Sequence, residues 1–227
     1  MKTVIIGDLH GNFENLEAIV KYNEDVGLIL QVGDFGCWKH LSNQILNLNK
    51  VLADNDVMLH WCDGNHEEFP FLHKNKLVTS NIVYQPRGTT MTLQDGRVVL
   101  FMGGADSIDK YSRTIGYDWF PDDEHITVRD LDKLPDVDVD IVISHTAPDY
   151  FDTHLDTTLH FKGIDLTTYS DPSCIALDTV YDRYKPKKWY FGHFHKFEKG
   201  KHDDCEWTML SHSKAYHISD FFSVLGE

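Results

Sequence analysis

Three stretches decide the fold class: TVIIGDLH at residues 3–10, LILQVGD at 28–34 and VMLHWCDGNH at 57–66. Each begins with an apolar run of the length of a buried strand and ends in glycine and polar residues. Between them, apolar side chains recur at helical spacing in 13–20 and 45–52. This alternation predicts a βαβαβ unit, whose parallel strands have their carboxyl ends at one edge of a sheet, where ligands usually bind.

Two later stretches have the same form, IVISH at 141–145 and WYFGHFH at 189–195.

The remaining patterns predict a hairpin over 89–93 and 97–102, a helix near 128–134, a long loop over 149–171, a helix from an N-cap at Ser173 to Tyr184, and strands over 201–213, the last polar and at a sheet edge. The chain has 227 residues, with no internal repeat, low-complexity tract or linker. We therefore expect one domain spanning residues 1–227.

Polar side chains that suit a metal site follow all five of these strands. They are Asp8, His10, Asp34, Asn65, His66, His145, His193 and His195. Taken singly, a glycine and aspartate after a strand usually form only a turn, and an HxH pair is usually two edge-strand histidines. The order and strand-end context of the whole set favour a metal site, and carboxylate, carboxamide and imidazole ligands without thiolate suit manganese, iron, zinc or cobalt at hydrolytic centres.

The ordered set DxH, GD, GNHE, a lone H and GHxH resembles the signature of the calcineurin-like metallophosphoesterase superfamily. The resemblance runs from Gly7 to His195, and every signature position is filled. It implies an α/β fold, a four-layer α/β/β/α sandwich with a dimetal site at the strand ends. It also implies hydrolysis of phosphate esters by a metal-bridging hydroxide.

The resemblance further assigns the ligands of the two metals. One metal would be held by Asp8, His10 and His195, the other by Asn65, His145 and His193, with Asp34 bridging both. His66 would protonate the leaving oxygen or steady the phosphate, and its alternative role is to orient a ligand from the outer shell. We expect two divalent ions, manganese before iron, zinc, cobalt or nickel, because two cations neutralise phosphate oxygens and activate a shared water.

The second turn departs from one branch of the superfamily. Protein serine/threonine phosphatases carry GDxxDRG there, whereas this chain reads GDFGCW at 33–38. Cys37 and Trp38 thus stand where an aspartate paired with the catalytic histidine and a phosphate-clamping arginine are expected. A monoester has extra charge for a guanidinium to neutralise, whereas metals and aromatic stacking can hold a diester.

We therefore expect a phosphodiesterase for nucleotides or other small diesters. A serine/threonine phosphoprotein phosphatase is the alternative, favoured by GNHE at 64–67 and by the size of the chain. A noncatalytic scaffold on the same fold is a third hypothesis, disfavoured because every ligand position is filled.

Composition limits the partners. Lysine and arginine number 21 against 36 aspartates and glutamates, a formal net charge of −15 that repels polyanions. Stable duplex binding is not expected, and a nuclease would be confined to short or single-stranded substrates. No apolar run approaches the roughly 18 residues that span a bilayer, and there is no CxxC pair or leader pattern, so we expect no membrane and a cytoplasmic location. The sequence contains no signal for or against self-association.

Further substrate contacts are sought in ADSIDKYSRTIGYDWF at 105–120. Basic groups there could meet phosphate and rings could stack a base, with a purely structural loop as an equal alternative; the candidates are Asp106, Lys110, Arg113, Trp119 and Phe120. Arg87 is another candidate clamp, although an exposed arginine is usually only solvated. The remaining histidines considered are expected to be surface or packing residues: His154, His160, His202, His212 and His217.

Overall fold

The computed structural model describes residues 1–23, 25–75, 79–154, 160–161, 164–165 and 170–225. Their strands form two large sheets and one small one. The first sheet has the order β13-β1-β2-β3-β4: β13 (Phe222–Val224), β1 (Lys2–Ile6), β2 (Val26–Gln31), β3 (Met58–Trp61) and β4 (Ile82–Tyr84). The second has the order β11-β12-β10-β7-β6-β5: β11 (Glu198–His202), β12 (Cys205–Met209), β10 (Lys188–Phe191), β7 (Ile141–Ser144), β6 (Val98–Met102) and β5 (Thr89–Thr92). The two-stranded sheet pairs β8 (His160–Phe161) with β9 (Ile164–Asp165).

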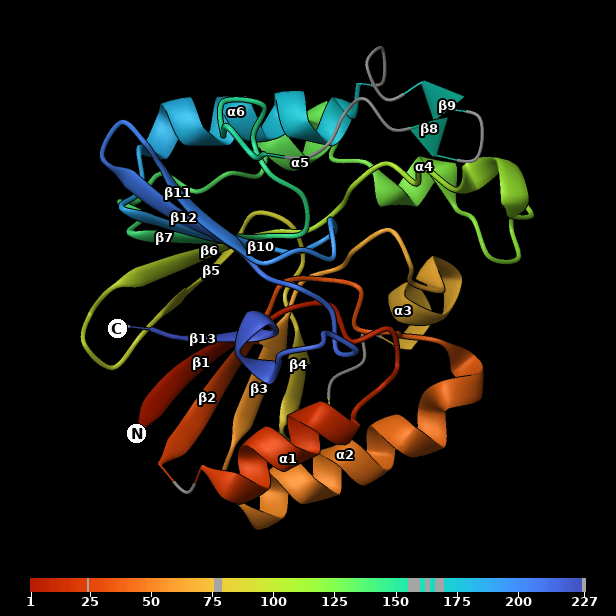
Figure 1. Cartoon of the computed structure of the whole chain (residues 1–227), viewed down its shortest axis with the longest axis vertical. Helices are drawn as coiled ribbons and strands as arrows, with labels where there is room; N and C mark the ends of the chain where they lie inside the picture. The colour runs from red at the N-terminus through yellow and green to blue at the C-terminus, as the bar shows by residue number, and fades with distance from the viewer. Residues whose placement is uncertain (24, 76–78, 155–159, 162–163, 166–169, 226–227) are drawn as a thin grey trace.

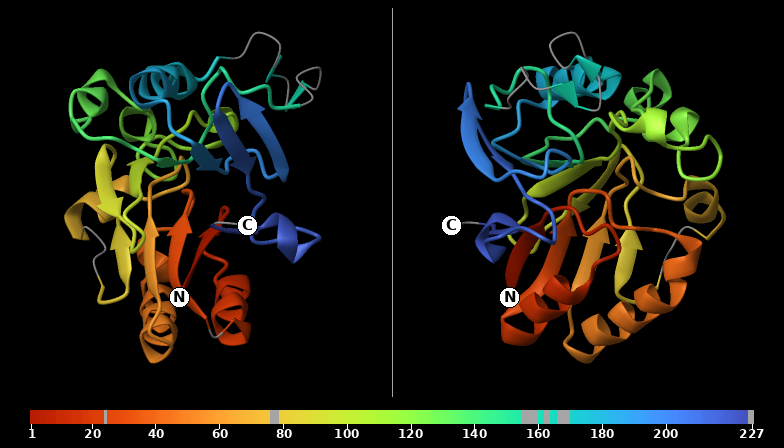
Figure 2. Two further views of the ribbon diagram at one scale, coloured as in Figure 1. Left: turned by 90° about the vertical axis from the view of Figure 1, so that its left-hand side faces the viewer. Right: turned by 45° about the vertical axis from the view of Figure 1, so that its right-hand side comes forward.

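Helices lie outside the two large sheets. Those described are α1 (Glu14–Tyr22), α2 (Ser42–Asp54), α3 (Phe69–Asn75), α4 (Pro121–Glu124), α5 (Val128–Leu131) and α6 (Pro172–Tyr184), with short 3-10 turns η1 (Lys39–Leu41), η2 (Lys110–Ser112) and η3 (Ile218–Asp220). Figure 1 shows α1 and α2 against the first sheet and α5 and α6 against the second, and the turned views in Figure 2 show the sheets stacked between these helix layers. No helix among the described residues is long and apolar enough to cross a membrane.

Alternation along β1 shows how one strand serves two apolar layers. Ile5 packs with residues of both sheets, including Val99 and Ile143, whereas Ile6 packs with the α1 residue Leu16. Successive side chains of a strand point to opposite faces, so each strand seals the space between the sheets and the space under the helices. A third core lies between the second sheet and α6. These three apolar layers confirm the predicted α/β/β/α sandwich.

The strand pairing confirms the expected parallel unit. β1, β2, β3 and β4 are parallel neighbours, and in the second sheet β6, β7, β10 and β12 are parallel. The hairpin of β5 and β6 is also present as predicted, with antiparallel pairing. The strands that precede the five polar motifs are therefore β1, β2 and β3 in one sheet and β7 and β10 in the other.

Several local predictions were wrong in detail. The N-cap of α6 is Asp171, whose carboxylate accepts the backbone N–H of Ser173 at 2.7 Å; the carboxylate reaches the free N–H groups of the first turn. In the region expected to end in an edge strand, β12 lies inside its sheet and β11 forms the edge. The helix expected near 128–134 is the shorter α5, and α3, β4 and β13 were not predicted. Part of the loop expected over 149–171 lies outside the described residues.

Candidate functional site

Sharp turns direct the strand-end side chains into one region. His10, Asp34, His193 and His195 all have left-handed backbone conformations, with φ between 49° and 66°. Such a conformation costs a non-glycine residue about 1–3 kcal/mol, and it typically persists at functional sites, where the surrounding structure enforces it. These turns close the ends of β1, β2 and β10, and they bring side chains from both sheets together.

The first group of side chains lies where β1 and β10 end. Nε2 of His10 is 3.0 Å from Nε2 of His195, and the latter nitrogen is 3.3 Å from Oδ2 of Asp8. Atoms that share one ion at roughly 2.0–2.2 Å lie about 3 Å from each other. Two imidazole nitrogens facing each other at this distance need a proton or cation between them, so the donor set fits a metal ion.

The second group gathers around the amide oxygen of Asn65. His145 Nε2 lies 3.0 Å from this oxygen and His193 Nδ1 lies 3.1 Å from it. Asp34 stands between the two groups, with Oδ1 3.4 Å from His145 Nε2 and Oδ2 3.6 Å from His10 Nε2. Its two oxygens thus face different groups, so this carboxylate could contact two ions at once.

Charge in the cluster favours cation binding. The Asp34 side chain is buried, and although burial raises its pKa, attraction from neighbouring imidazoles, that of His145 above all, holds that pKa well below its usual value. Burial lowers the pKa of His145, but the Asp34 carboxylate outweighs it and raises the pKa to about 9. A buried, ionised carboxylate that holds a proton on a neighbouring imidazole attracts a divalent cation for the same electrostatic reason.

An outer layer fixes the orientation of Asn65. Its Nδ2 donates to Oγ of Ser107 at 3.0 Å, and this hydroxyl donates to the buried Glu124 carboxylate at 2.7 Å. Trp119 Nε1 donates to the same carboxylate at 2.9 Å. The amide nitrogen is therefore turned away from the cluster and the oxygen toward it. Trp119, for which base stacking and a structural role were equal alternatives, thus donates within this hydrogen-bonded chain.

Glu67, the acidic residue of GNHE, stabilises the turn at residues 33–38. The buried carboxylate of Glu67 accepts the backbone N–H groups of Phe35 at 2.7 Å, Gly36 at 3.2 Å and Cys37 at 2.5 Å. Cys37 is itself buried and brings no charge, and burial raises the pKa of its thiol. The carboxylate thus holds the turn that contains Asp34.

His66 lies beside the first group, with its ring centroid 5.1 Å from that of His10. Nη2 of Arg113 lies 3.0 Å from its Nδ1 and closer still to its Nε2. Burial, and to a smaller extent the Arg113 charge, lower the pKa of His66 to about 4 despite the opposing Asp34 carboxylate. His66 is therefore a neutral imidazole at pH 7 in this structure, which suits steadying a phosphate better than donating a full proton.

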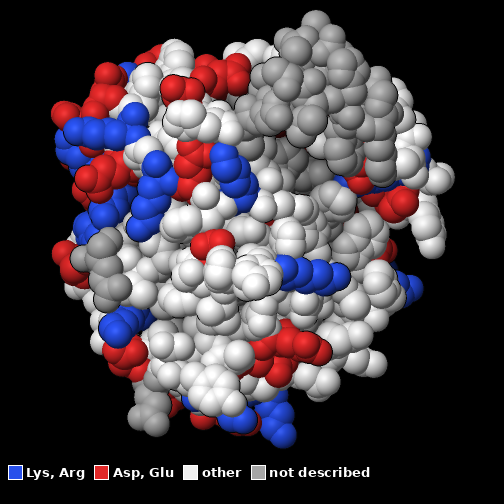
Figure 3. All heavy atoms as spheres, viewed as in Figure 1, with Lys and Arg blue, Asp and Glu red and all other residues white. Residues whose placement is uncertain are grey.

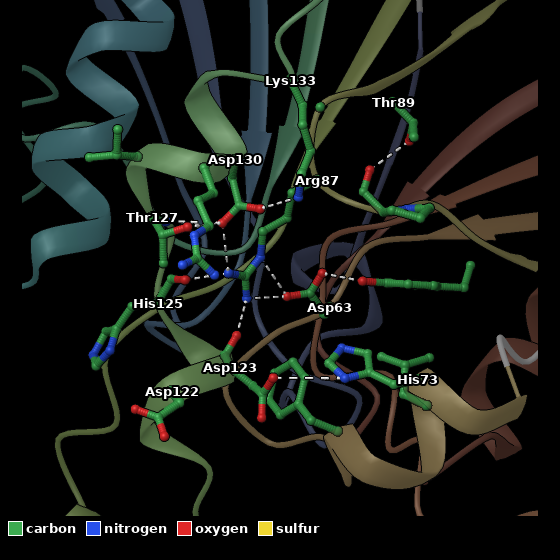
Figure 4. A pocket seen from close by; sticks show the side chains of 17 residues that line it. Asp63, His73, Arg87, Thr89, Asp122, Asp123, His125, Thr127, Asp130 and Lys133 are labelled. Atoms are coloured by element: carbon green, nitrogen blue, oxygen red, sulfur yellow. Dashed lines mark hydrogen bonds and ion pairs between the residues drawn. The ribbon is translucent and has the colours of Figure 1, made fainter.

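Other candidates from the sequence have different places. Arg87 is neither a solvated surface residue nor a free clamp for phosphate. Its guanidinium bonds Asp63 and the backbone oxygens of Asp123, Glu124 and His125. Figure 4 shows it against a cavity of about 1010 Å³, whose lining includes none of the eight predicted site residues.

The loop candidates and remaining histidines also separate. Phe120 is buried in the core and Lys110 pairs with Asp106 at 2.7 Å. The ring of His212, which no sequence pattern placed at the site, lies 4.6 Å from that of His195. The other rings have partners outside the cluster: His154 contacts Glu198, His202 stacks on Tyr150 and His217 contacts Tyr216. The side chain of His160 lies outside the described residues.

A family comparison decides the affiliation of the chain. The model of the calcineurin-like phosphoesterase family matches residues 1–197, which include every residue of the two groups. The chain belongs to this family. Its membership makes the chain a metal-dependent phosphoester hydrolase. Asp8 with His10 and His195, and Asp8 with Asp34 and His145, are groups whose ligand atoms lie close enough together to hold a metal ion. No functionally curated protein matches the chain.

Solved structures support the fold of this phosphoesterase. The phosphopantetheinyl hydrolase PptH from Mycobacterium tuberculosis is 14% identical, with a TM-score of 0.60 over 100% of this chain and 96% of that one. The protein TT1561 of Thermus thermophilus is 11% identical, with a TM-score of 0.58 over 98% of this chain and 97% of that one. A putative 5'-nucleotidase from Staphylococcus aureus is 12% identical, with a TM-score of 0.53 over 98% of this chain and 52% of that one.

Proposed function

We propose that this phosphoesterase hydrolyses small phosphodiesters, nucleotide-like compounds among them, at a two-manganese centre. One ion would be held by Asp8, His10 and His195. The other ion would be held by Asn65, His145 and His193, and the Asp34 carboxylate would bind both ions. When bound, the two ions supply charge neutralisation and an activated water for in-line attack. His66, beside this centre, would steady a phosphate oxygen through a ring N–H.

The observation that carries the choice of a diester is that both candidate arginine clamps, Arg113 and Arg87, are already bonded within the protein. Among the described residues, no lysine or arginine forms an ion pair with Asp8 or Asp34. Arg113, the arginine that contacts His66, already bonds Asp109 and backbone oxygens, and Arg87 is buried against Asp63. A dianionic monoester would lack a free guanidinium, whereas a monoanionic diester needs less neutralisation.

A hollow beside the cluster has room for the second substituent of a diester. It has a volume of about 420 Å³ and is bordered by His195, so it adjoins the first group directly. Lys214 contributes a cation to its lining and Tyr216 an exposed aromatic ring, whereas the ammonium group of Lys196 pairs with Glu198 at 2.8 Å. Such a wall suits a nucleotide-like group, whose base stacks on aromatic rings and whose further phosphates attract ammonium groups.

Long nucleic acids fit the chain less well. On the face in Figure 3, lysine and arginine are interspersed with aspartate and glutamate, without a continuous basic stripe among the described residues. A cytoplasmic location is also part of the proposal, because all four cysteines are free and buried thiols. So is a single domain, because the candidate ligands come from both sheets and neither sheet carries the site alone.

The test compares hydrolysis of bis(p-nitrophenyl) phosphate, p-nitrophenyl phosphate and a phosphoserine peptide, with manganese and with EDTA. Asp34→Asn removes the candidate bridge, and Asp25→Asn, an exposed surface carboxylate paired with Lys2, is its matched control. We expect manganese-dependent diester cleavage in the wild type and the control, and its loss in Asp34→Asn. Preferential turnover of the phosphopeptide would instead establish the alternative, a phosphoprotein phosphatase, and activity that resists EDTA would refute a metal centre.

A further inference from the structure

The backbone of His66 is held from two directions. Its N–H donates to Oδ1 of Asp34 at 2.8 Å, and its carbonyl oxygen accepts Nε1–H of Trp38 at 2.9 Å. These bonds fix where the side chain starts, but they leave the rotation of the imidazole about its own bonds unset. The direction of the ring therefore depends on the groups that contact the ring itself.

Arg113 is the side chain that hydrogen-bonds this ring, whose other described ring contact is the edge-on imidazole of His10. Arg113 lies in the segment after β6, directly after the 3-10 turn η2, and its side chain is only 6% exposed. Nη2 donates to Asp109 at 2.6 Å and faces both nitrogens of His66. Nη1 donates to the backbone oxygens of Asn65 at 3.2 Å and Asp118 at 3.4 Å.

These contacts make the guanidinium a fixed group. A guanidinium has five N–H donors in one rigid plane, and four of them are directed at acceptors of the protein. Rotating it toward a bound substrate would break the ion pair with Asp109 and leave backbone oxygens unpaired in a buried place. Arg113 is therefore poorly suited to clamp a substrate phosphate and well suited to hold a neighbouring side chain.

We propose that the Asp109–Arg113 pair is the brace that orients the His66 imidazole toward the phosphoester. This proposal rests on the function proposed above. Nη2 lies nearer to Nε2 of His66 than to Nδ1, and because a guanidinium can only donate, Nε2 must present a lone pair and Nδ1 then carries the proton. The brace thus selects one tautomer as well as one ring direction, and Arg113 is a positioning residue for His66.

The kinetic test combines Arg113→Met and His66→Asn, singly and together, with a series of aryl phosphodiesters of different leaving-group acidity. We expect Arg113→Met to lower kcat by about 10- to 100-fold with KM unchanged, the usual cost of losing an outer-shell partner. Across the series of leaving groups, the decrease in kcat caused by Arg113→Met should parallel the decrease caused by His66→Asn. The double variant should be no slower than His66→Asn alone. Arg97→Met, which removes an arginine from an exposed pair with Asp95, is the matched control and should leave the rates unchanged.

Two results would overturn the brace. One is a rise in KM alone that persists in full in the His66→Asn background, because it would make Arg113 a substrate-binding group. The other is an unchanged tautomer of His66 in Arg113→Met, read from nitrogen NMR of the zinc-loaded, histidine-labelled protein. We expect a single tautomer in the wild type and a mixture in the variant.

The NMR measurement needs no turnover, so it separates this proposal from the proposed function. A wild type that cleaves no diester refutes the function, while its ring signals still decide the brace. If Arg113→Met does not fold, Asp109→Asn takes its place, because it keeps the guanidinium but removes its charged anchor. We expect a smaller loss of kcat and the same mixture of tautomers from that variant.

Discussion

Gly64→Ala should disable the metal centre through the insertion of one methyl group. Gly64 does not have a left-handed backbone, so alanine is conformationally acceptable there. Its Cβ, however, would lie 2.8 Å from Cγ of Asp34 and nearer still to Oδ1 and to the backbone nitrogen of Asp34. Carbon atoms in contact prefer about 3.5–4.0 Å, so the backbone and carboxylate of Asp34 must together retreat by roughly 0.7–1.2 Å. Metal–ligand distances tolerate only about 0.2 Å.

We therefore expect Gly64→Ala to weaken manganese binding by about 100-fold, equivalent to about 2.8 kcal/mol. The free energy of unfolding should fall by about 1–3 kcal/mol from overpacking. Calorimetric manganese titration and diester hydrolysis measure the first effect, and urea unfolding of the metal-free protein measures the second.

The control is Gly96→Ala. At Gly96 φ is +91° and a Cβ would meet nothing within 4 Å, so that variant loses about 1–2 kcal/mol of stability to backbone strain without touching the site. Manganese affinity of Gly64→Ala within threefold of the wild type would refute the reasoning, because it would show that Asp34 need not stay where the structure places it.

Three further outcomes follow from the site and its surroundings. Ser107→Ala should release the amide of Asn65 and weaken binding of one of the two metal ions by about tenfold, seen as a separation of two steps in a zinc titration. Metal affinity should rise with pH between 6 and 8, because His145, with a pKa of about 9, must lose its proton to bind; an affinity independent of pH would contradict its place in the site. The hydrogen bond to Asp106 raises the pKa of His125, so its contribution to stability is present below pH 6.5 and lost as pH rises through the raised value. Urea unfolding across this range should show that decline in the wild type and less of it in His125→Gln.

Local pattern in the sequence was enough to predict the strands and the polar ends of β1, β2, β3, β7 and β10. A strand of apolar residues ending in glycine and a polar residue is encoded within ten residues, because period and turn chemistry are local properties. The ordered motifs then carried the resemblance to the family and, with it, the four-layer sandwich. The structure brings all eight predicted residues into one region, while their roles as ligands stay predictions.

The supports of these residues were decided by tertiary structure. Ser107 reaches Asn65 from 42 residues away, and Arg113 reaches His66 from 47 residues away, across the boundary between the two sheets. Nothing in a loop of serine, arginine and aromatic residues states which of them will face a strand end in another part of the chain. Contacts of this kind depend on how the sheets stack, which is a sum over many packing interactions.

Arg87 shows the same limit from the opposite direction. The sequence indicates an arginine beside a proline, typical of an exposed turn, yet folding buries it against Asp63 at the end of β3. A buried charge is tolerated only with partners, and these come from residues 24 to 38 positions away along the chain. The sequence by itself determined the family, the sheet-forming segments and the candidate ligands. Only the tertiary structure decided which charges are buried, which are paired and which side chains orient the site, because those depend on distances between segments that no local pattern contains.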